Sequence, residues 1–142
     1  MEGRKAKAVW NGKLKHGNGT VEVESGLFKD APYSYKSRFE EGTGTNPEEL
    51  IGAAHAGCFS MAFSGILEQN GFNPERISTN AEVKIEFVGG GFKITKIILS
   101  TEGEIPGIEK QVFDRLAMEA KENCPVSRAL EATPIELKAT LI

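Results

Sequence analysis

The sequence predicts an α+β domain in which antiparallel β-sheets wrap around one long buried helix. The stretch from Leu50 to Leu67 carries no charge if His55 is neutral, and apolar or small residues fall on every helical face. A helix that is apolar all round is normally buried. Segments before and after this stretch alternate between apolar and polar residues, as strands do. We find no repeat or linker, so we expect one domain over residues 1–142.

Composition narrows the function classes. The net charge of −3 gives no electrostatic case for nucleic acid or for an anionic membrane surface. Met1–Lys7 is basic but no apolar segment follows it, so we expect no signal peptide and a cytoplasmic location. In that compartment a disulfide between the two cysteines would be transient and catalytic rather than structural.

Short strands and turns are predicted before the long helix. The expected elements are strands at Lys7–Trp10 and Thr20–Glu24, a third short strand at Leu27–Lys29, and a mixed segment at Ala31–Phe39. Glycines at positions 12, 17, 19 and 26 provide the turns between them.

The long helix has clear start and stop signals. Asn46 can cap the first exposed N–H groups, Pro47 suits the first helical position, and Glu48 and Glu49 complement the positive end of the dipole. Gly71 is a plausible C-terminal stop.

The length of the helix also raises a membrane span as an alternative, because about eighteen uncharged residues reach the lower limit for one. The small and polar residues within the stretch argue against it, as does the lack of a second such segment.

The second half of the chain reads as a hairpin, two helices and a final strand. The expected elements are strands at Ile77–Phe87 and Phe92–Leu99, helices at Ile108–Asn123 and Val126–Leu130, and a strand at Ile135–Ile142.

The two cysteines occupy different helical environments. Cys58 lies within the buried helix, where its pKa would rise unless a cation were near. Cys124 precedes Pro125 at the start of a short helix, where unpaired N–H groups favour the thiolate. Spacing alone leaves two readings open: a peroxide-reactive thiol with its resolving partner, or two unrelated buried side chains.

Two further hypotheses involve His55. A metal site could combine His55 and Cys58 with Cys124 and His16, although no CxxC or HxxxH spacing supports it. His55 could instead act as the base for Cys58 in a thiol hydrolase, since residues three apart on a helix are neighbours. A buried, uncharged histidine with a packing role is the third interpretation.

Two motifs together resemble the osmotically inducible protein C family, which is related to the organic hydroperoxide resistance proteins. They are G-T-N-P-E-E-L-I-G-A-A-H-A-G-C-F-S-M-A at Gly44–Ala62 and N-C-P-V-S at Asn123–Ser127. Further matches lie at Lys5–Gly12, Gly17–Val21, Glu24–Gly26, Pro32–Tyr33, Arg38–Glu40 and Ile94–Ile97. The A-A-H-A form around His55 indicates the osmotically inducible branch.

The resemblance implies a thiol-dependent peroxidase that reduces organic hydroperoxides in oxidative and osmotic stress defence. Carried over by position, Cys58 is the peroxidatic cysteine, Cys124 the resolving cysteine, Arg38 the cation beside Cys58 and Glu48 the carboxylate that holds Arg38. It also implies no bound cofactor and no metal, an external dithiol reductant for which lipoylated proteins are one source, and an intertwined homodimer. Without the resemblance, Arg38 would be read as half of a surface salt bridge.

Helix geometry supports sites shared between two chains. Glu48 lies ten positions before Cys58, about 15 Å along a helix, so the two cannot meet within one chain. In an antiparallel pair of such helices, Glu48 of one subunit would lie level with Cys58 of the other, and small residues at Gly52, Ala53, Ala56 and Gly57 would allow close packing.

We also expect an apolar pocket that favours bulky organic hydroperoxides over hydrogen peroxide. The candidates for its lining are Phe59, Met61 and Phe63, with Phe39 or Tyr35. The competing interpretation of the whole chain is a non-catalytic dimeric binding or stress-structural domain whose cysteines are merely buried.

Overall fold

Ten helices and strands follow one another along residues 1–142, all of which the computed structural model describes. In chain order they are β1 (Ala6–Asn11), β2 (Asn18–Val23), β3 (Ala31–Tyr33), α1 (Tyr35–Phe39), α2 (Pro47–Gln69), β4 (Arg76–Val88), β5 (Gly91–Glu104), α3 (Lys110–Asn123), α4 (Pro125–Ala129) and β6 (Ile135–Leu141). The chain divides into two compact units, Met1–Leu50 and Ile51–Ile142.

The first unit is an antiparallel sheet in the order β1-β2-β3, followed by α1. The predicted third strand at Leu27–Lys29 is wrong, because this segment belongs to a turn and the strand begins at Ala31. Positive φ angles at Gly26 and Asp30 (76° and 51°) bracket the segment and prevent it from extending either neighbouring strand.

Helix α2 begins and ends where the sequence predicts. The Asn46 side chain accepts a hydrogen bond from the Glu49 backbone N–H at 2.8 Å, and Pro47 is the first helical residue. After the last turn, Gly71 adopts φ 85°, which glycine adopts at little cost.

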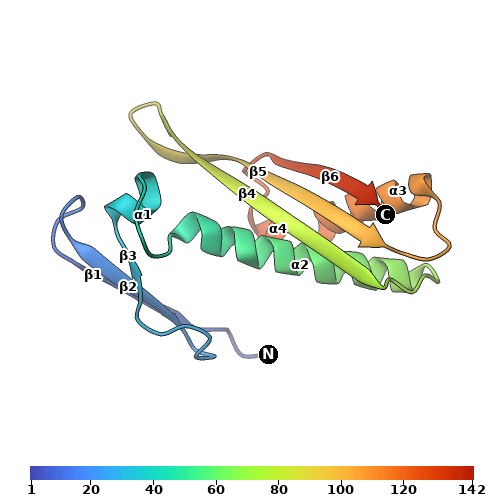
Figure 1. The fold of residues 1–142 in the computed structure, drawn as a ribbon, viewed down its shortest axis with the longest axis horizontal. Helices are drawn as coiled ribbons and strands as arrows, with labels where there is room; N and C mark the ends of the chain where they lie inside the picture. Colours follow the sequence, from blue (N-terminus) through green and yellow to red (C-terminus); the bar gives the residue numbers. More distant parts are fainter. The chain divides into compact units, whose positions relative to one another are not determined.

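The second unit contains a three-stranded sheet in the order β4-β5-β6 (Figure 1). β4 and β5 form the predicted antiparallel hairpin, with a register shift between Lys84 and Ile85. β6 pairs parallel to β5, whereas we expected antiparallel sheets throughout. The connection through α3 and α4 explains this difference, since a helical crossover returns the chain in the same direction.

The apolar core lies wholly within the second unit, where α2, the sheet and α3 meet. The Phe63 ring packs against Phe59 and Phe113, with centroid distances of 5.7 and 5.3 Å. The fully or nearly fully buried apolar residues are Phe59, Phe63, Leu67, Ile97, Leu99, Ile105, Phe113, Leu116, Ala117, Ala120 and Cys124. None of them comes from the first unit.

Within the second unit, helix α2 is covered on only one side. Of its most apolar eighteen-residue window, 28% is buried, and Ala53, Ala54, Gly57 and Met61 are exposed. The sequence predicted burial all round, but one sheet and α3 can cover only one side of a helix. By length and composition alone α2 could also cross a membrane, a test that core helices of soluble proteins pass as well.

Candidate active site

Cys124 is held at the start of α4. It is the N-cap residue of this helix, and its sulfur accepts a hydrogen bond from the Ser127 backbone N–H at 3.3 Å. Pro125 fills the first helical position, where its missing N–H costs nothing. The residue is fully buried, and its backbone N–H bonds to Ala120 at the end of α3. The predicted N-cap position of Cys124 is therefore confirmed.

Cys58 comes from the middle of α2 and meets Cys124 at this point. Both cysteines are free thiols, and Cys58 is only partly buried. Burial raises the pKa of the Cys58 thiol, a hydrogen bond from the Val126 backbone N–H opposes this rise, and a hydrogen bond with Cys124 adds to it. The first turn of α4 thus donates an N–H to the Cys124 sulfur and also influences the pKa of Cys58.

A buried polar chain continues from Cys124 to His55. The Cys124 thiol donates to Ser127 Oγ at 3.1 Å, and Ser127 Oγ lies 2.7 Å from His55 Nε2. His55 is fully buried, and burial lowers the pKa of its imidazole. Its Nδ1 is buried without a hydrogen-bond partner. The contact with Ser127 replaces the His55–Cys58 pairing that a thiol hydrolase would need.

The alternative metal set of His55, Cys58, Cys124 and His16 does not assemble. No group of three or more histidine, cysteine, aspartate or glutamate side chains in the chain could hold a metal ion.

Arg38 and Glu48 form a tight ion pair in the first unit. Arg38 Nη2 and Nε donate to Glu48 Oε1 at 2.8 and 3.1 Å, and Nε lies 3.3 Å from Oε2. Glu48 is 5% exposed, whereas the Arg38 side chain is 36% exposed. The carboxylate therefore fixes one edge of the guanidinium, and the rest of the guanidinium stays accessible. Because Glu48 is buried and bonds to two nitrogens, the pair differs from an ordinary surface salt bridge.

The backbone around this pair is fixed by local hydrogen bonds. Ser34 and Ser37 form a capping box at the start of α1, with bonds of 3.1 and 2.8 Å between each side chain and the other residue's N–H. The Ser37 hydroxyl lies 2.8 Å from the Thr45 carbonyl, and Asn46 Nδ2 donates to the Ser37 carbonyl at 3.2 Å. These bonds tie α1 to the start of α2.

An aromatic hollow adjoins Arg38 within the first unit. It has a volume of about 190 Å³ and is lined by Trp10, Leu14, Tyr33, Ser34, Tyr35, Arg38 and Phe39. Tyr35 and Phe39 pack at 5.0 Å between ring centroids, and the guanidinium lies 4.9 Å from the Phe39 ring centre.

The predicted aromatic lining is partly wrong. Phe59 and Phe63 are fully buried in the core because they face the sheet and α3, and Met61 is 79% exposed on the opposite side. Of the residues expected to line an apolar pocket, Tyr35 and Phe39 border the hollow beside Arg38.

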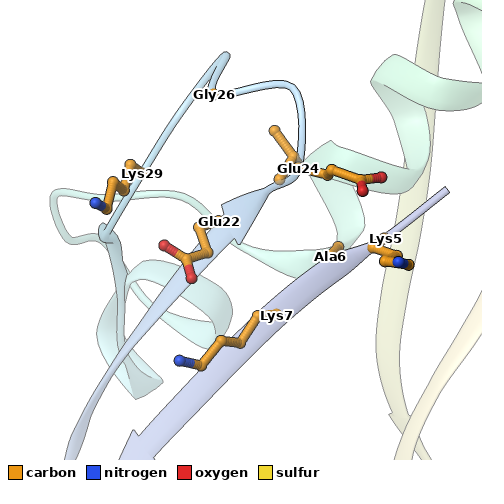
Figure 2. Close-up of a pocket in the computed structure, with 8 residues that line it drawn as sticks. Lys5, Ala6, Lys7, Glu22, Glu24, Gly26 and Lys29 are labelled. Atoms are coloured by element: carbon orange, nitrogen blue, oxygen red, sulfur yellow. The ribbon is translucent and has the colours of Figure 1, made fainter.

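A larger hollow of about 350 Å³ lies on β1 and β2, and its lining is charged rather than apolar (Figure 2). Lysines 5, 7 and 29 alternate there with glutamates 22 and 24. Three lysines against two glutamates leave little net charge, and no cysteine, serine or histidine lines the hollow, so it is not a candidate active site.

Sequence reasoning missed two contributors to the site. They are the Ser127 hydroxyl and the Val126 backbone N–H. A serine three positions after an N-cap residue is the spacing of a capping box, so the N-C-P-V-S motif held a signal for Ser127. No local pattern predicts the bond from Ser127 to His55, which joins residues 72 positions apart.

Comparison with known proteins identifies the family of the chain. Residues 40–139 match the family model for OsmC-like proteins. Peroxiredoxin OsmC of Escherichia coli (strain K12) is 51% identical over 129 residues, covering 91% of this chain and 90% of the relative.

Solved structures share the fold. An organic hydroperoxide resistance protein OsmC from Legionella pneumophila superimposes with a TM-score of 0.66 at 26% identity, covering 96% of both chains. An OsmC-like protein from Mycoplasma pneumoniae gives a TM-score of 0.75 over 99% of this chain and 98% of its own, at 16% identity, which speaks for the fold alone.

The different burial of the two sulfurs gives a first prediction. Brief treatment of the native protein with iodoacetamide should label Cys58 first, because Cys124 is fully buried. Peptide mass spectrometry measures the labelled fraction at each position. In urea both thiols should react alike, and Cys58→Ser should protect the native chain from rapid labelling. Equal labelling of Cys124 in the native state would contradict this arrangement.

Proposed function

Because the chain belongs to the OsmC-like protein family, we propose that it is a thiol-dependent peroxidase that reduces organic hydroperoxides to alcohols. The observation that carries this proposal is the contact between two free thiols, Cys58 and Cys124, at the start of α4. In such a pair, a sulfenic acid on one sulfur can condense with the other thiol to a disulfide without a large movement of the backbone. The chemistry needs no prosthetic group, because thiols supply both electrons.

The reaction assigns one role to each sulfur. The Cys58 thiolate attacks the terminal peroxide oxygen, the O–O bond breaks, and the alcohol leaves once its oxygen is protonated. Cys58 is then a sulfenic acid. Cys124 attacks the Cys58 sulfur, and the Cys58–Cys124 disulfide forms with release of water. An external dithiol, such as a lipoylated protein, reduces the disulfide and completes the cycle.

Arg38 supplies the positive charge that Cys58 lacks. Burial and the Cys124 contact both raise the pKa of Cys58, so the thiolate needs a cation. Arginine keeps its charge when partly buried, and Glu48 holds its guanidinium in place. The same guanidinium can stabilise negative charge on the departing alkoxide.

We propose that each site is shared between the two chains of an intertwined homodimer. Ten helical residues separate Glu48 from Cys58 on α2, about 15 Å, so the Arg38–Glu48 pair serves the partner's thiol.

Ala53 and Gly57, two of the small residues expected at the helix contact, are exposed, and a Cβ at Gly57 would meet nothing within 4 Å. Gly52 is instead buried against Ala81 and Val83 of β4, so it does not take part in this contact.

The first unit supports the same assembly. It contributes no fully buried apolar side chain, and some fifty residues without a core seldom fold unaided. In the dimer, both units of each chain belong to one peroxidase domain over residues 1–142.

The aromatic hollow beside Arg38 favours organic over inorganic peroxides. Its rings offer apolar surface to the carbon part of a hydroperoxide, whereas hydrogen peroxide gains nothing from them. We place the enzyme in the cytoplasm, in defence against oxidative and osmotic stress.

Peroxide turnover tests the function directly. With dithiothreitol as reductant, the native enzyme should consume an organic hydroperoxide faster than hydrogen peroxide. Cys58→Ser should abolish turnover because it removes the nucleophile, while circular dichroism shows an intact fold. Cys124→Ser should still react once with peroxide but retain a sulfenic acid that dimedone traps. Absence of turnover in the native protein would favour the non-catalytic interpretation, and undiminished turnover in Cys58→Ser would contradict the role of Cys58 as the nucleophile.

Mixed dimers test the sharing of sites. Arg38→Met should lower the rate of the peroxide step at least tenfold, since a neighbouring cation shifts a thiol pKa by about one to three units. When Cys58→Ser and Arg38→Met chains are unfolded and refolded together, roughly a quarter of the native activity should return, in heterodimers with one complete site.

The control is a mixture of wild-type chains with chains that carry both substitutions. Its heterodimers contain no complete site if the sites are shared, but one complete site if each chain serves itself. Absence of recovery in the first mixture, with heterodimers verified by mass, would overturn the shared site.

A further inference from the structure

We infer that Ser127 and His55 form a proton relay that activates Cys124 for attack on the Cys58 sulfenic acid. This inference rests on the peroxidase function proposed above and concerns its second chemical step. Ser127 touches the reacting sulfur, and His55 acts through Ser127.

A continuous chain of contacts joins the Cys124 thiol to the His55 imidazole. The Cys124 thiol donates to Ser127 Oγ at 3.1 Å. A serine hydroxyl has one proton of its own to give, and Oγ lies 2.7 Å from His55 Nε2. With the Ser127 hydroxyl donating to Nε2, every proton along the chain points toward His55.

His55 is suited to receive a proton only briefly. Burial lowers the pKa of the imidazole, so the ring is neutral at neutral pH, and the relay uses the tautomer with its proton on Nδ1 and a free lone pair on Nε2. Its Nδ1, buried and without a partner, offers no bond that would hold the ring charged. The titratable groups joined to His55 by contacts are Cys124, through Ser127, and Cys58, through Cys124.

Cys124 needs such a route because its sulfur is enclosed. The residue is fully buried, as is His55, and Ser127 is 4% exposed, so hydroxide from solvent has poor access to the thiol proton. If these hydrogen bonds only stabilised the fold, the last group in the series would not have to be a base. A hydroxyl needs only an acceptor, and an amide would serve.

The step balances within these residues. Cys124 S–H transfers its proton to Ser127, and Ser127 passes its own to His55 Nε2. The Cys124 sulfur then forms a bond to the Cys58 sulfur, the S–O bond of the sulfenic acid breaks, and the leaving hydroxide takes up one proton to become water. One proton leaves His55 in turn, so the overall change is sulfenic acid plus thiol to disulfide plus water.

Single-turnover kinetics separate this step from the attack on peroxide. One equivalent of an organic hydroperoxide is added, and the reaction is quenched at intervals with dimedone. Mass spectrometry then follows the Cys58 sulfenic acid and the disulfide separately. The variants are His55→Gln, which keeps a polar side chain but no base, Ser127→Ala, which removes the relay atom, and Ser127→Thr, which keeps the hydroxyl.

Thr101→Val is a matched control. Thr101 is also buried and belongs to a hydroxyl chain, bonding to Thr79 at 2.9 Å, which in turn accepts from Ser60 at 2.8 Å. This chain reaches neither sulfur through a bond, so its loss should affect stability but not disulfide formation.

At pH 7, His55→Gln and Ser127→Ala should form sulfenic acid within twofold of the native rate but form the disulfide at least tenfold more slowly. Ser127→Thr should recover most of the second rate. In the two defective variants that rate should rise with pH, because hydroxide must take the proton. The native rate should stay nearly flat from pH 6.5 to 8.

Disulfide formation at the native rate and pH dependence in both His55→Gln and Ser127→Ala would overturn the relay. An equal slowing in Thr101→Val would overturn it too, since the effect would then be structural. Failure of the native protein to form either the sulfenic acid or the disulfide would instead refute the peroxidase function. If His55→Gln does not fold, Ser127→Ala alone decides, because it removes a single oxygen atom.

Discussion

The first turn of α4 positions the two thiols on which the proposed chemistry depends. The Ser127 N–H donates to the sulfur of Cys124, and the Val126 N–H lies close enough to Cys58 to lower the pKa of its thiol. The first N–H groups of any helix lack a partner within the helix. Here Pro125, which has no N–H, occupies the first helical position. The free N–H groups at the start of this helix thus help to hold the two thiols in contact.

The positive charge in the proposed mechanism comes from elsewhere in the chain. Arg38 is fixed by Glu48 at the beginning of α2, and Cys58 follows ten residues later on the same helix. A straight helix keeps these groups apart, and this constraint is what makes a second chain necessary in our account. The small exposed residues Ala53 and Gly57 on α2 and the lack of an apolar core in the first unit are both consistent with such a second chain.

Local signals in the sequence were sufficient for α2, the β4–β5 hairpin and the N-cap position of Cys124, because capping and alternation are short-range effects. Tertiary pairing was not predictable in this way. The bond from Ser127 to His55 depends on how α4 packs on α2, and the parallel pairing of β6 depends on a crossover. Phe59 and Phe63 were placed in a pocket because periodicity cannot tell a helix side that faces the core from one that faces substrate.

The most direct test of the central claim is the intact mass of the chain after one equivalent of an organic hydroperoxide, followed by peptide mapping. Our account predicts the loss of two hydrogens per chain and a single cross-linked peptide joining Cys58 to Cys124 of the same chain. A lasting gain of one oxygen, a cross-link between two chains, or two unreacted thiols would contradict it.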